Sequence, residues 1–286
     1  MFDVAGRRQR ALVTLTHSEY GTLALFRPRE TPGVAVTDSS LTKAQRAAEL
    51  ALRELGGLPS TPAGGVLEIV SNVPHGVGMG SSTSDVVAAI RAVADYHAVE
   101  LRQDTVARLA VEAEKASDAI MVPDRVVLFA HRAGTVLETL GTSLPPLVVL
   151  GSNAEPGGNV DTLRHPPAQY EESDLAVFGI LRAALRRAIE AGDPFLLGRV
   201  TTASARLNQR FLPKRRLEDV IELCRRHGGC GVQVAHSGTV MGLLFDARLP
   251  DVEEAVQACA AGLERLDLPA CTVLRTGHVR QAVRVR

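Results

Sequence analysis

The spacing of apolar residues along the chain separates helical from extended segments. In residues 42–56 apolar side chains recur every three or four positions and the pattern stops at two glycines, as in a helix with a glycine stop. The same spacing predicts helices over residues 81–97, 103–116, 173–191, 194–210, 215–227 and 251–266. Short apolar runs predict strands over residues 11–17, 22–28, 66–74, 125–131, 135–140, 146–151, 271–276 and 279–285, and an extended stretch over residues 231–246.

The order of these elements predicts an α+β fold. Strands and helices are mixed without strict alternation, which favours two α+β layers over a doubly wound parallel sheet. Pro and Gly crowd residues 152–172, which makes this stretch the best linker candidate. We therefore predict two domains, over residues 1–152 and 153–286. At the start of the chain, the turn-forming residues 18–21 predict a β-hairpin between the first two strands.

Composition narrows the class of protein. The 286 residues include 32 Lys+Arg against 32 Asp+Glu, and a formal net charge of zero argues against a protein held to nucleic acid by a basic surface. The longest apolar runs fall far short of the roughly 18 residues of a membrane helix, and the first residues lack the apolar region of a signal peptide. The four cysteines form no C-x-x-C pair, which favours buried free thiols. We expect a cytoplasmic protein that binds neither nucleic acid nor membrane.

The sharpest chemical signal is the strand, glycine-rich turn and helix of residues 66–90, VLEIVSNVPHGVGMGSSTSDVVAAI. Glycines at every second position allow a tight turn that brings backbone N–H groups close to an anion. Ser81 and Ser82 fall in the first helical turn, where free N–H groups and the positive end of the dipole favour phosphate. The loop matches neither G-x-x-x-x-G-K-[ST] nor G-x-G-x-x-G. Spacing alone therefore favours a phosphate-binding loop no more than a turn that is simply capped by serine.

This stretch resembles the central motif of the GHMP kinases, P-x-x-x-G-[LM]-G-S-S-[AT]. The matching residues are Pro74, Gly76, Gly78, Met79, Gly80, Ser81, Ser82 and Thr83. Within that superfamily the chain is similar to the L-threonine kinases of cobalamin biosynthesis, through residues 116–141, 144–151 with 160–163, 206–214 and 229–245. The resemblance implies a nucleotide cleft between an N-terminal α/β domain and a C-terminal ferredoxin-like α+β domain.

The resemblance also implies the cofactors ATP and magnesium and assigns roles to the loop. The backbone from Gly76 to Ser82, with Thr83 after it, is expected to hold the ATP phosphates, and the Ser82 hydroxyl to contact magnesium. Asp118 matches the acid that accepts or orients the proton of the substrate hydroxyl. Without the family pattern, an aspartate at this place is more often a helix-end or turn carboxylate.

A second group of residues is expected at the acceptor. His236, Ser237 and Gly238 match a glycine-containing loop that lies close to the phosphates and acceptor in the family. A lone histidine beside a turn is more often structural, and this alternative stays open for His236. Asn208 and Gln209 lie on a predicted helix, where polar residues could reach a cleft but a solvated surface is the expected place.

Two departures from the family pattern bear on activity. The family's segment of the form P-x-[ST]-C-G-E has no counterpart in MFDVAGRRQRALV, and Lys115 and Ala116 stand where the family has Glu and Pro. A glutamate there could help to hold magnesium and a lysine cannot, so Glu112 and Glu114 are the nearest substitutes. We expect a chain that folds, binds nucleotide weakly and phosphorylates threonine poorly or not at all.

These observations favour an ATP-dependent phosphotransferase that acts on the side-chain hydroxyl of an amino acid, with L-threonine first and O-phospho-L-threonine as product, in cobalamin or secondary-metabolite biosynthesis. A GHMP kinase for another alcohol, such as homoserine or serine, is the alternative among enzymes. A non-catalytic nucleotide-binding homologue is the alternative outside them. The expected partners are ATP and a small hydroxy amino acid, and a homodimer stays open.

Overall fold

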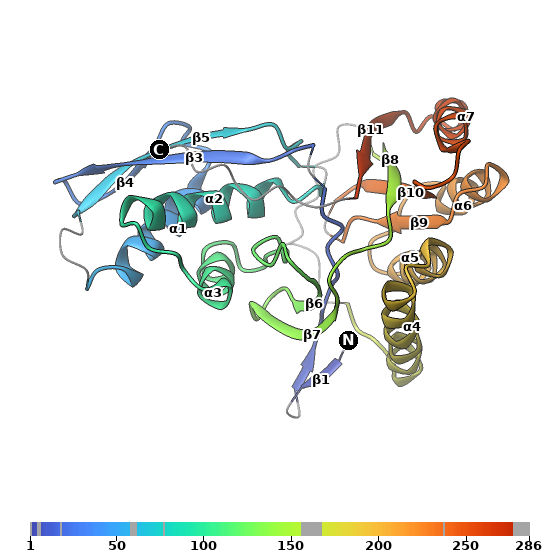
Figure 1. Ribbon diagram of the computed structural model, residues 1–286, viewed down its shortest axis with the longest axis horizontal. Helices are drawn as coiled ribbons and strands as arrows, with labels where there is room; N and C mark the ends of the chain where they lie inside the picture. Colours follow the sequence, from blue (N-terminus) through green and yellow to red (C-terminus); the bar gives the residue numbers. More distant parts are fainter. Residues whose placement is uncertain are drawn as a thin grey trace.

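The computed structural model describes residues 2–4, 7–17, 19–57, 62–76, 78–155, 168–236 and 238–276. The chain forms two lobes (Figure 1). Strands β3 to β5 with helices α1 to α3 make the first lobe, and strands β8 to β11 with helices α4 to α7 make the second. Strands β6 and β7 and the N-terminal strands lie between them.

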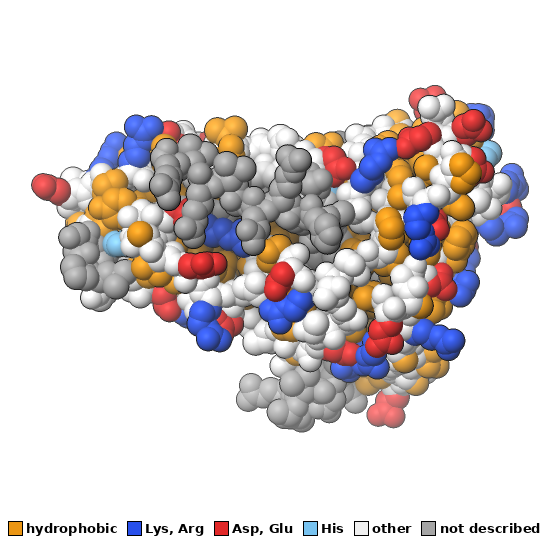
Figure 2. Space-filling view, viewed as in Figure 1, with side chains coloured by type: hydrophobic (Ala, Val, Ile, Leu, Met, Phe, Trp, Pro, Cys, Tyr) orange, Lys and Arg blue, Asp and Glu red, His pale blue; other side chains and the backbone are white. Residues whose placement is uncertain are grey.

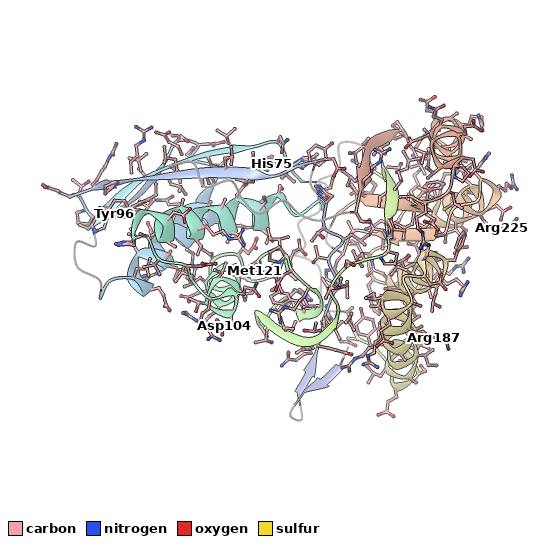
Figure 3. All side chains as sticks on the ribbon, viewed as in Figure 1. His75, Tyr96, Asp104, Met121, Arg187 and Arg225 are labelled. Carbon is pink, nitrogen blue, oxygen red and sulfur yellow. The ribbon has the colours of Figure 1, made fainter. Side chains whose placement is uncertain are left out.

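The first lobe packs one layer of helices on a mixed three-stranded sheet. The strands β3 (Thr22–Arg29), β5 (Gly64–Ser71) and β4 (Gly33–Val36) follow in that order, β3 antiparallel and β4 parallel to β5. The helices are α1 (Thr42–Glu54), α2 (Ser81–Tyr96) and α3 (Gln103–Glu114). Their apolar faces bury Leu67, Ile90 and Leu109 in one core. Met121, labelled near the middle of this lobe, is 1% exposed (Figure 3). The helix pattern of the sequence is therefore satisfied by burial against β5 and neighbouring helices.

The second lobe has the ferredoxin-like arrangement expected from the resemblance. Its sheet runs in the order β11 (Ala270–Arg275), β8 (Leu147–Asn153), β10 (Val240–Asp246) and β9 (Gly231–Val234), with every neighbour antiparallel. Between β8 and β9 the chain forms α4 (Glu172–Glu190), α5 (Pro194–Asn208) and α6 (Leu217–Arg226), and α7 (Val252–Arg265) precedes β11. Counting α4 to α6 as one crossover gives β-α-β-β-α-β, the split β-α-β topology. Arg187 and Arg225 lie on the outer faces of α4 and α6 (Figure 3).

The predicted hairpin at the start of the chain is wrong. Residues 11–17 form no strand except for a bridge in which Leu12 and Phe129 exchange backbone hydrogen bonds of 2.9 Å. Strand β3 pairs with β5 instead, with Leu23 opposite Val70. The turn-forming residues did not produce a hairpin because Leu12 pairs with a distant strand instead. This strand is β6 (Val126–Ala130), which is fully buried and pairs with β7 (Thr135–Gly141). The short strands β1 (Phe2–Val4) and β2 (Arg7–Gln9) pair with each other further upstream.

The pairing of β8 bears on the predicted domain boundary. A boundary at residue 152 assigns β8 to the first domain, but β8 lies in the middle of the second sheet between β10 and β11. Removing it would cut that sheet in two, so we propose that the division falls between β7 and β8, in residues 142–146. The predicted strand 279–285 and most of the predicted linker lie outside the described residues.

The surface agrees with the balanced charge of the sequence. Acidic and basic side chains are interspersed over the face seen in Figure 2. Among the described helices none is long and apolar enough to cross a membrane. Three cysteines are buried as free thiols, whereas Cys271 is exposed because it lies on β11, an edge strand whose side chains are mostly exposed.

Candidate active site

The glycine-rich loop after β5 has the backbone conformation that its glycines predict. Gly76, Gly78 and Gly80 have φ angles of 76°, 92° and 78°, a region that residues with a Cβ rarely adopt. Gly80 is the N-cap of α2 and, within the described residues, no side chain caps this helix. The N–H groups of Ser81 and Ser82 therefore stand at a positive helix end without a side-chain acceptor, which is the arrangement that binds phosphate.

Asp118 lies directly against this loop. A Cβ built on Gly80 would stand 3.1 Å from Asp118 Oδ2, and the Asp118 backbone N–H donates to Thr83 Oγ1 at 3.3 Å. Burial raises the pKa of Asp118. No hydrogen bond to its carboxylate is found in the part of the chain that the structure describes, so this carboxylate is free to accept a proton or a hydrogen bond from a ligand.

A second carboxylate, Glu114, meets the loop from the end of α3. Its Oε2 accepts a 2.7 Å hydrogen bond from Ser82 Oγ, and its Oε1 accepts one of 2.8 Å from Thr83 Oγ1. Glu114 is 6% exposed, and burial raises its pKa while the hydrogen bonds from Ser82 and Thr83 lower it. Lys43, from the first turn of α1, donates to Ser82 Oγ at 3.2 Å. Oxygen ligands and one cation therefore meet at the start of α2.

The two glutamates predicted as substitutes near residue 115 differ in their contacts with the loop. Lys115 is exposed, has a φ angle of 69° at the end of α3 and makes no hydrogen bond with Ser82 or Thr83 among the described contacts. Glu112 is exposed as well. Glu114 alone of the two predicted substitutes reaches Ser82. Neither Lys43 nor this choice between glutamates could be read from the spacing of the sequence.

The turn between β9 and β10 packs on the other end of the glycine-rich loop. A Cβ at Gly78 would stand 2.7 Å from Gly238 Cα and 2.8 Å from Ala235 Cβ, so only glycine allows this approach. Lys214 is 3% exposed, and its Nζ donates to the Gly238 carbonyl at 2.6 Å. Burial lowers the pKa of Lys214 to about 8. The predicted Ser237 lies outside the described residues.

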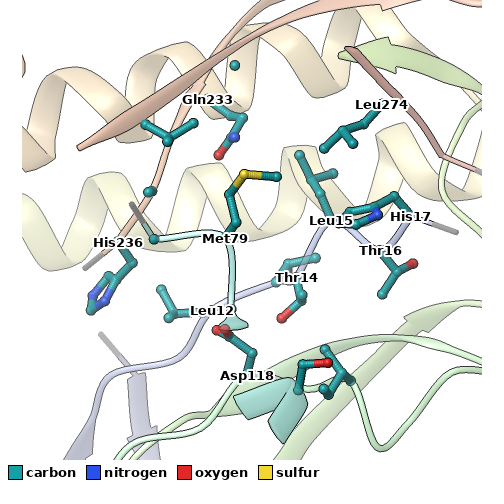
Figure 4. Close-up of a pocket in the computed structure, with 18 of the residues that line it drawn as sticks. Leu12, Thr14, Leu15, Thr16, His17, Met79, Asp118, Gln233, His236 and Leu274 are labelled. Carbon is teal, nitrogen blue, oxygen red and sulfur yellow. The ribbon is translucent and has the colours of Figure 1, made fainter. Parts of the chain in front are cut away.

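A cavity of about 1040 Å³ extends from this junction into the space between the two lobes. Met79, Asp118 and His236 line it, together with residues 10–17, which run across its floor (Figure 4). Asn208 lines it too, and its buried Nδ2 has no hydrogen-bond partner among the described residues. The expected solvated surface is therefore wrong for Asn208. Its neighbour Gln209 is used internally, exchanging 2.7 and 2.8 Å hydrogen bonds with the backbone of Lys214.

The structure places the predicted residues at the loop, in the turn before it and along the cavity. Gly78, Gly80, Ser82, Thr83 and Asp118 meet at the loop, and Gly238 packs against it. Pro74 and Gly76 lie in the turn that leaves β5, and Met79 and His236 line the cavity. Their roles toward ATP and acceptor stay predictions.

Comparison with known proteins identifies two family domains in the chain. The family model described as "GHMP kinases N terminal domain" matches residues 42–123, and the one described as "GHMP kinases C terminal" matches residues 183–262. The chain is 30% identical to an L-threonine kinase of Citrobacter freundii over 65% of its length and 64% of that protein, so the match spans less than two thirds of this relative.

Two further proteins are similar to this chain. An L-threonine kinase of Salmonella typhimurium is 28% identical over 65% of this chain and 61% of that protein. The crystal structure of a homoserine kinase from Cytophaga hutchinsonii superposes with a TM-score of 0.66 at 18% identity, covering 89% of this chain and 85% of that one, a likeness of fold.

Proposed function

Because the chain belongs to the GHMP kinase family, we propose that it transfers the γ-phosphoryl group of ATP to the side-chain hydroxyl of L-threonine. The observation that carries the proposal is the Asp118 carboxylate, which lies against Gly80 without a hydrogen-bond partner in the described chain. It stands where a hydroxyl would approach a phosphate held at the start of α2. The two L-threonine kinases to which the chain is similar favour threonine as the acceptor.

ATP would lie with its phosphates at the start of α2. The free backbone N–H groups of the first helical turn and the Lys43 ammonium supply positive charge there. The developing charge on the transferred phosphoryl group is stabilised by fixed donors rather than by covalent chemistry. The contact of Gly78 with Gly238 closes the other side of the loop.

The oxygen ligands of the loop fit magnesium. Mg²⁺ is usually bound through one or two carboxylates together with substrate phosphates, and Glu114 with the Ser82 hydroxyl supplies such a set. Among the described residues, no three His, Cys, Asp or Glu side chains gather into a site that could hold a metal ion without the phosphates of a bound substrate. A bound magnesium ion would neutralise phosphate charge.

In the transfer, the threonine hydroxyl oxygen forms the new bond to the γ-phosphorus as the bond from that phosphorus to the β–γ bridging oxygen breaks and ADP leaves. The hydroxyl proton passes to Asp118 or is oriented by it. A carboxylate whose pKa is raised by burial is a better proton acceptor than a solvated one.

The test uses the whole chain at micromolar concentration, so that slow turnover is detected, with Mg-ATP and L-threonine. Phosphorus NMR should show ADP and O-phospho-L-threonine formed in equal amounts. Parallel reactions with L-homoserine and L-serine distinguish the other alcohols. ATP binding without any phosphorylated amino acid would contradict the proposal and favour a non-catalytic nucleotide-binding protein.

A further inference from the structure

Four segments that are distant in the sequence bring nitrogen-bearing side chains together beside the Gly238 turn. The first residue after β2, the β6–β7 turn, the loop after α5 and the β9–β10 turn each contribute. We call this group the cationic corner: Arg10, His131, Arg132, Lys214 and His236. The rings of the two histidines lie edge to face with their centroids 5.0 Å apart.

The described residues form no ion pair with Arg10 or Arg132, whereas Glu155 interacts electrostatically with Lys214. The Arg10 guanidinium donates to the Ala168 carbonyl and lies 5.6 Å from the centre of the Tyr170 ring, and neither contact carries a negative charge. Burial and the neighbouring Arg10 and Arg132 lower the pKa of His236 to about 4, and burial together with His236 and both arginines lowers that of His131 to about 3. No acidic residue is among the groups that act on either histidine.

Two buried side-chain nitrogen atoms lack a hydrogen-bond partner among the described residues. His131 is 4% exposed and its Nδ1 lacks a hydrogen-bond partner within the described chain. Asn208 Nδ2 is likewise buried and unpaired, and Asn208 is the neighbour of Gln209, which holds Lys214 in the corner. Buried polar groups of this kind are normally satisfied, so the corner has the features of a site for an anion.

The cationic corner lies close to Asp118. Asp118 Oδ2 lies against Gly80. Ala235 and Gly238, which flank His236 and Ser237 in the sequence, lie against Gly78. Gly78 and Gly80 are two residues apart, and two residues of chain span at most about 7 Å. Arg10, Asp118 and His236 also line the same cavity (Figure 4 labels the latter two).

We propose that Arg10, with Arg132 and His236 beside it, binds the carboxylate of the acceptor amino acid and so selects acceptors that carry this group. The inference rests on the proposed function. In threonine only three carbon atoms separate the hydroxyl oxygen from the carboxylate oxygens, and Asp118 and Arg10 line the same cavity. The planar guanidinium matches a carboxylate with two parallel hydrogen bonds.

ATP phosphate is the other anion that this corner could hold. Lys43, Ser82 and Thr83 at the start of α2 do not line the cavity, whereas Arg10 and His236 do. We therefore assign the phosphates to the start of α2 and the carboxylate to the cationic corner.

The test compares L-threonine with L-threoninamide, which has nearly the same shape and no negative charge. The unmodified protein should phosphorylate L-threonine with the higher kcat/KM. Arg10→Gln should raise the KM for L-threonine roughly ten- to hundredfold, the worth of a hydrogen bond between charged groups, and leave the KM for threoninamide and ATP nearly unchanged. Arg132→Gln should act in the same direction with a smaller effect.

Arg187→Gln is the matched control, because Arg187 is exposed on the outer face of α4 and does not line the cavity. It should leave both acceptors unaffected. Loss of the Arg10 contact with Ala168 would lower activity on both acceptors equally, so only a changed ratio supports the proposal.

A preference for L-threonine that survives Arg10→Gln would overturn the inference, as would a rise confined to the KM for ATP. If the unmodified protein phosphorylates neither acceptor, the proposed function fails first. Calorimetric binding of L-threonine and L-threoninamide to the protein with Mg-ADP then tests the corner alone, and equal affinities would refute it.

Discussion

Two carboxylates four residues apart approach the same loop and are used differently. Both are shielded from solvent, and burial raises the pKa of each. Glu114 at the end of α3 accepts hydrogen bonds from Ser82 and Thr83 on both oxygens. Asp118, in the turn that follows, has none on its carboxylate among the described residues. A carboxylate fixed by hydroxyls suits the holding of a loop and its cation, and an unpaired one suits proton transfer.

The largest effect should come from removing the charge of the unpaired carboxylate. Asp118→Asn keeps the shape of the side chain, so Mg-ATP should bind as before while turnover falls by roughly two to four powers of ten, the contribution of a positioned acid–base group. Single-turnover kinetics with a separate measurement of ATP affinity check this. A matching loss of ATP affinity would make Asp118 a ligand of the metal or a structural residue.

A smaller effect on turnover, and a larger one on cofactor binding, should follow at Glu114. Glu114→Gln removes the charge next to Ser82 and should weaken Mg-ATP binding roughly ten- to hundredfold, as for groups that hold a metal site in place. Glu112→Gln, two residues earlier on the same helix and exposed, is the control. Titration with ATP at several magnesium concentrations measures both. Equal behaviour of the two variants would remove Glu114 from the site.

The smallest expected effect is on the free energy of unfolding, which should rise in a variant whose activity falls. The raised pKa of Asp118 means that the folded protein binds its proton more tightly than the unfolded chain does, so stability falls as pH rises through that pKa. Asp118→Asn removes this cost and should raise the free energy of unfolding by about 1 kcal/mol at pH 7. Urea unfolding at pH 7 and near pH 3 checks this, because the gain should vanish where the unfolded aspartate is protonated. A gain independent of pH would contradict the electrostatic cause.

The sequence predicted the elements of this fold better than their pairing. Helix α2 follows from periodicity that burial against β5 then satisfies. The hairpin of residues 11–28 failed because a local turn signal says nothing about β5, more than 40 residues further along the chain. The pairing of β8 could not be predicted for the same reason, since its partners come after residue 239.

The candidate site shows the same limit. The loop glycines lie in a motif with fixed local spacing and were found from it, whereas Asp118 was predicted only from the resemblance to the family. Lys43 and Arg10 come from separate segments, and only the packing of the lobes brings them near the loop or the cavity. His131 carries no local signal beyond its place at the end of a buried strand.

The contact of Gly78 with Gly238 also bears on how the chain folds. These residues are 160 positions apart in the sequence, and each belongs to a lobe with its own core. Each lobe can gain its secondary structure from contacts within itself, but the junction forms only when both lobes are complete and docked. On refolding from denaturant, helical content should therefore return before the ability to bind ATP. The last step of folding is then the one that completes the proposed active site.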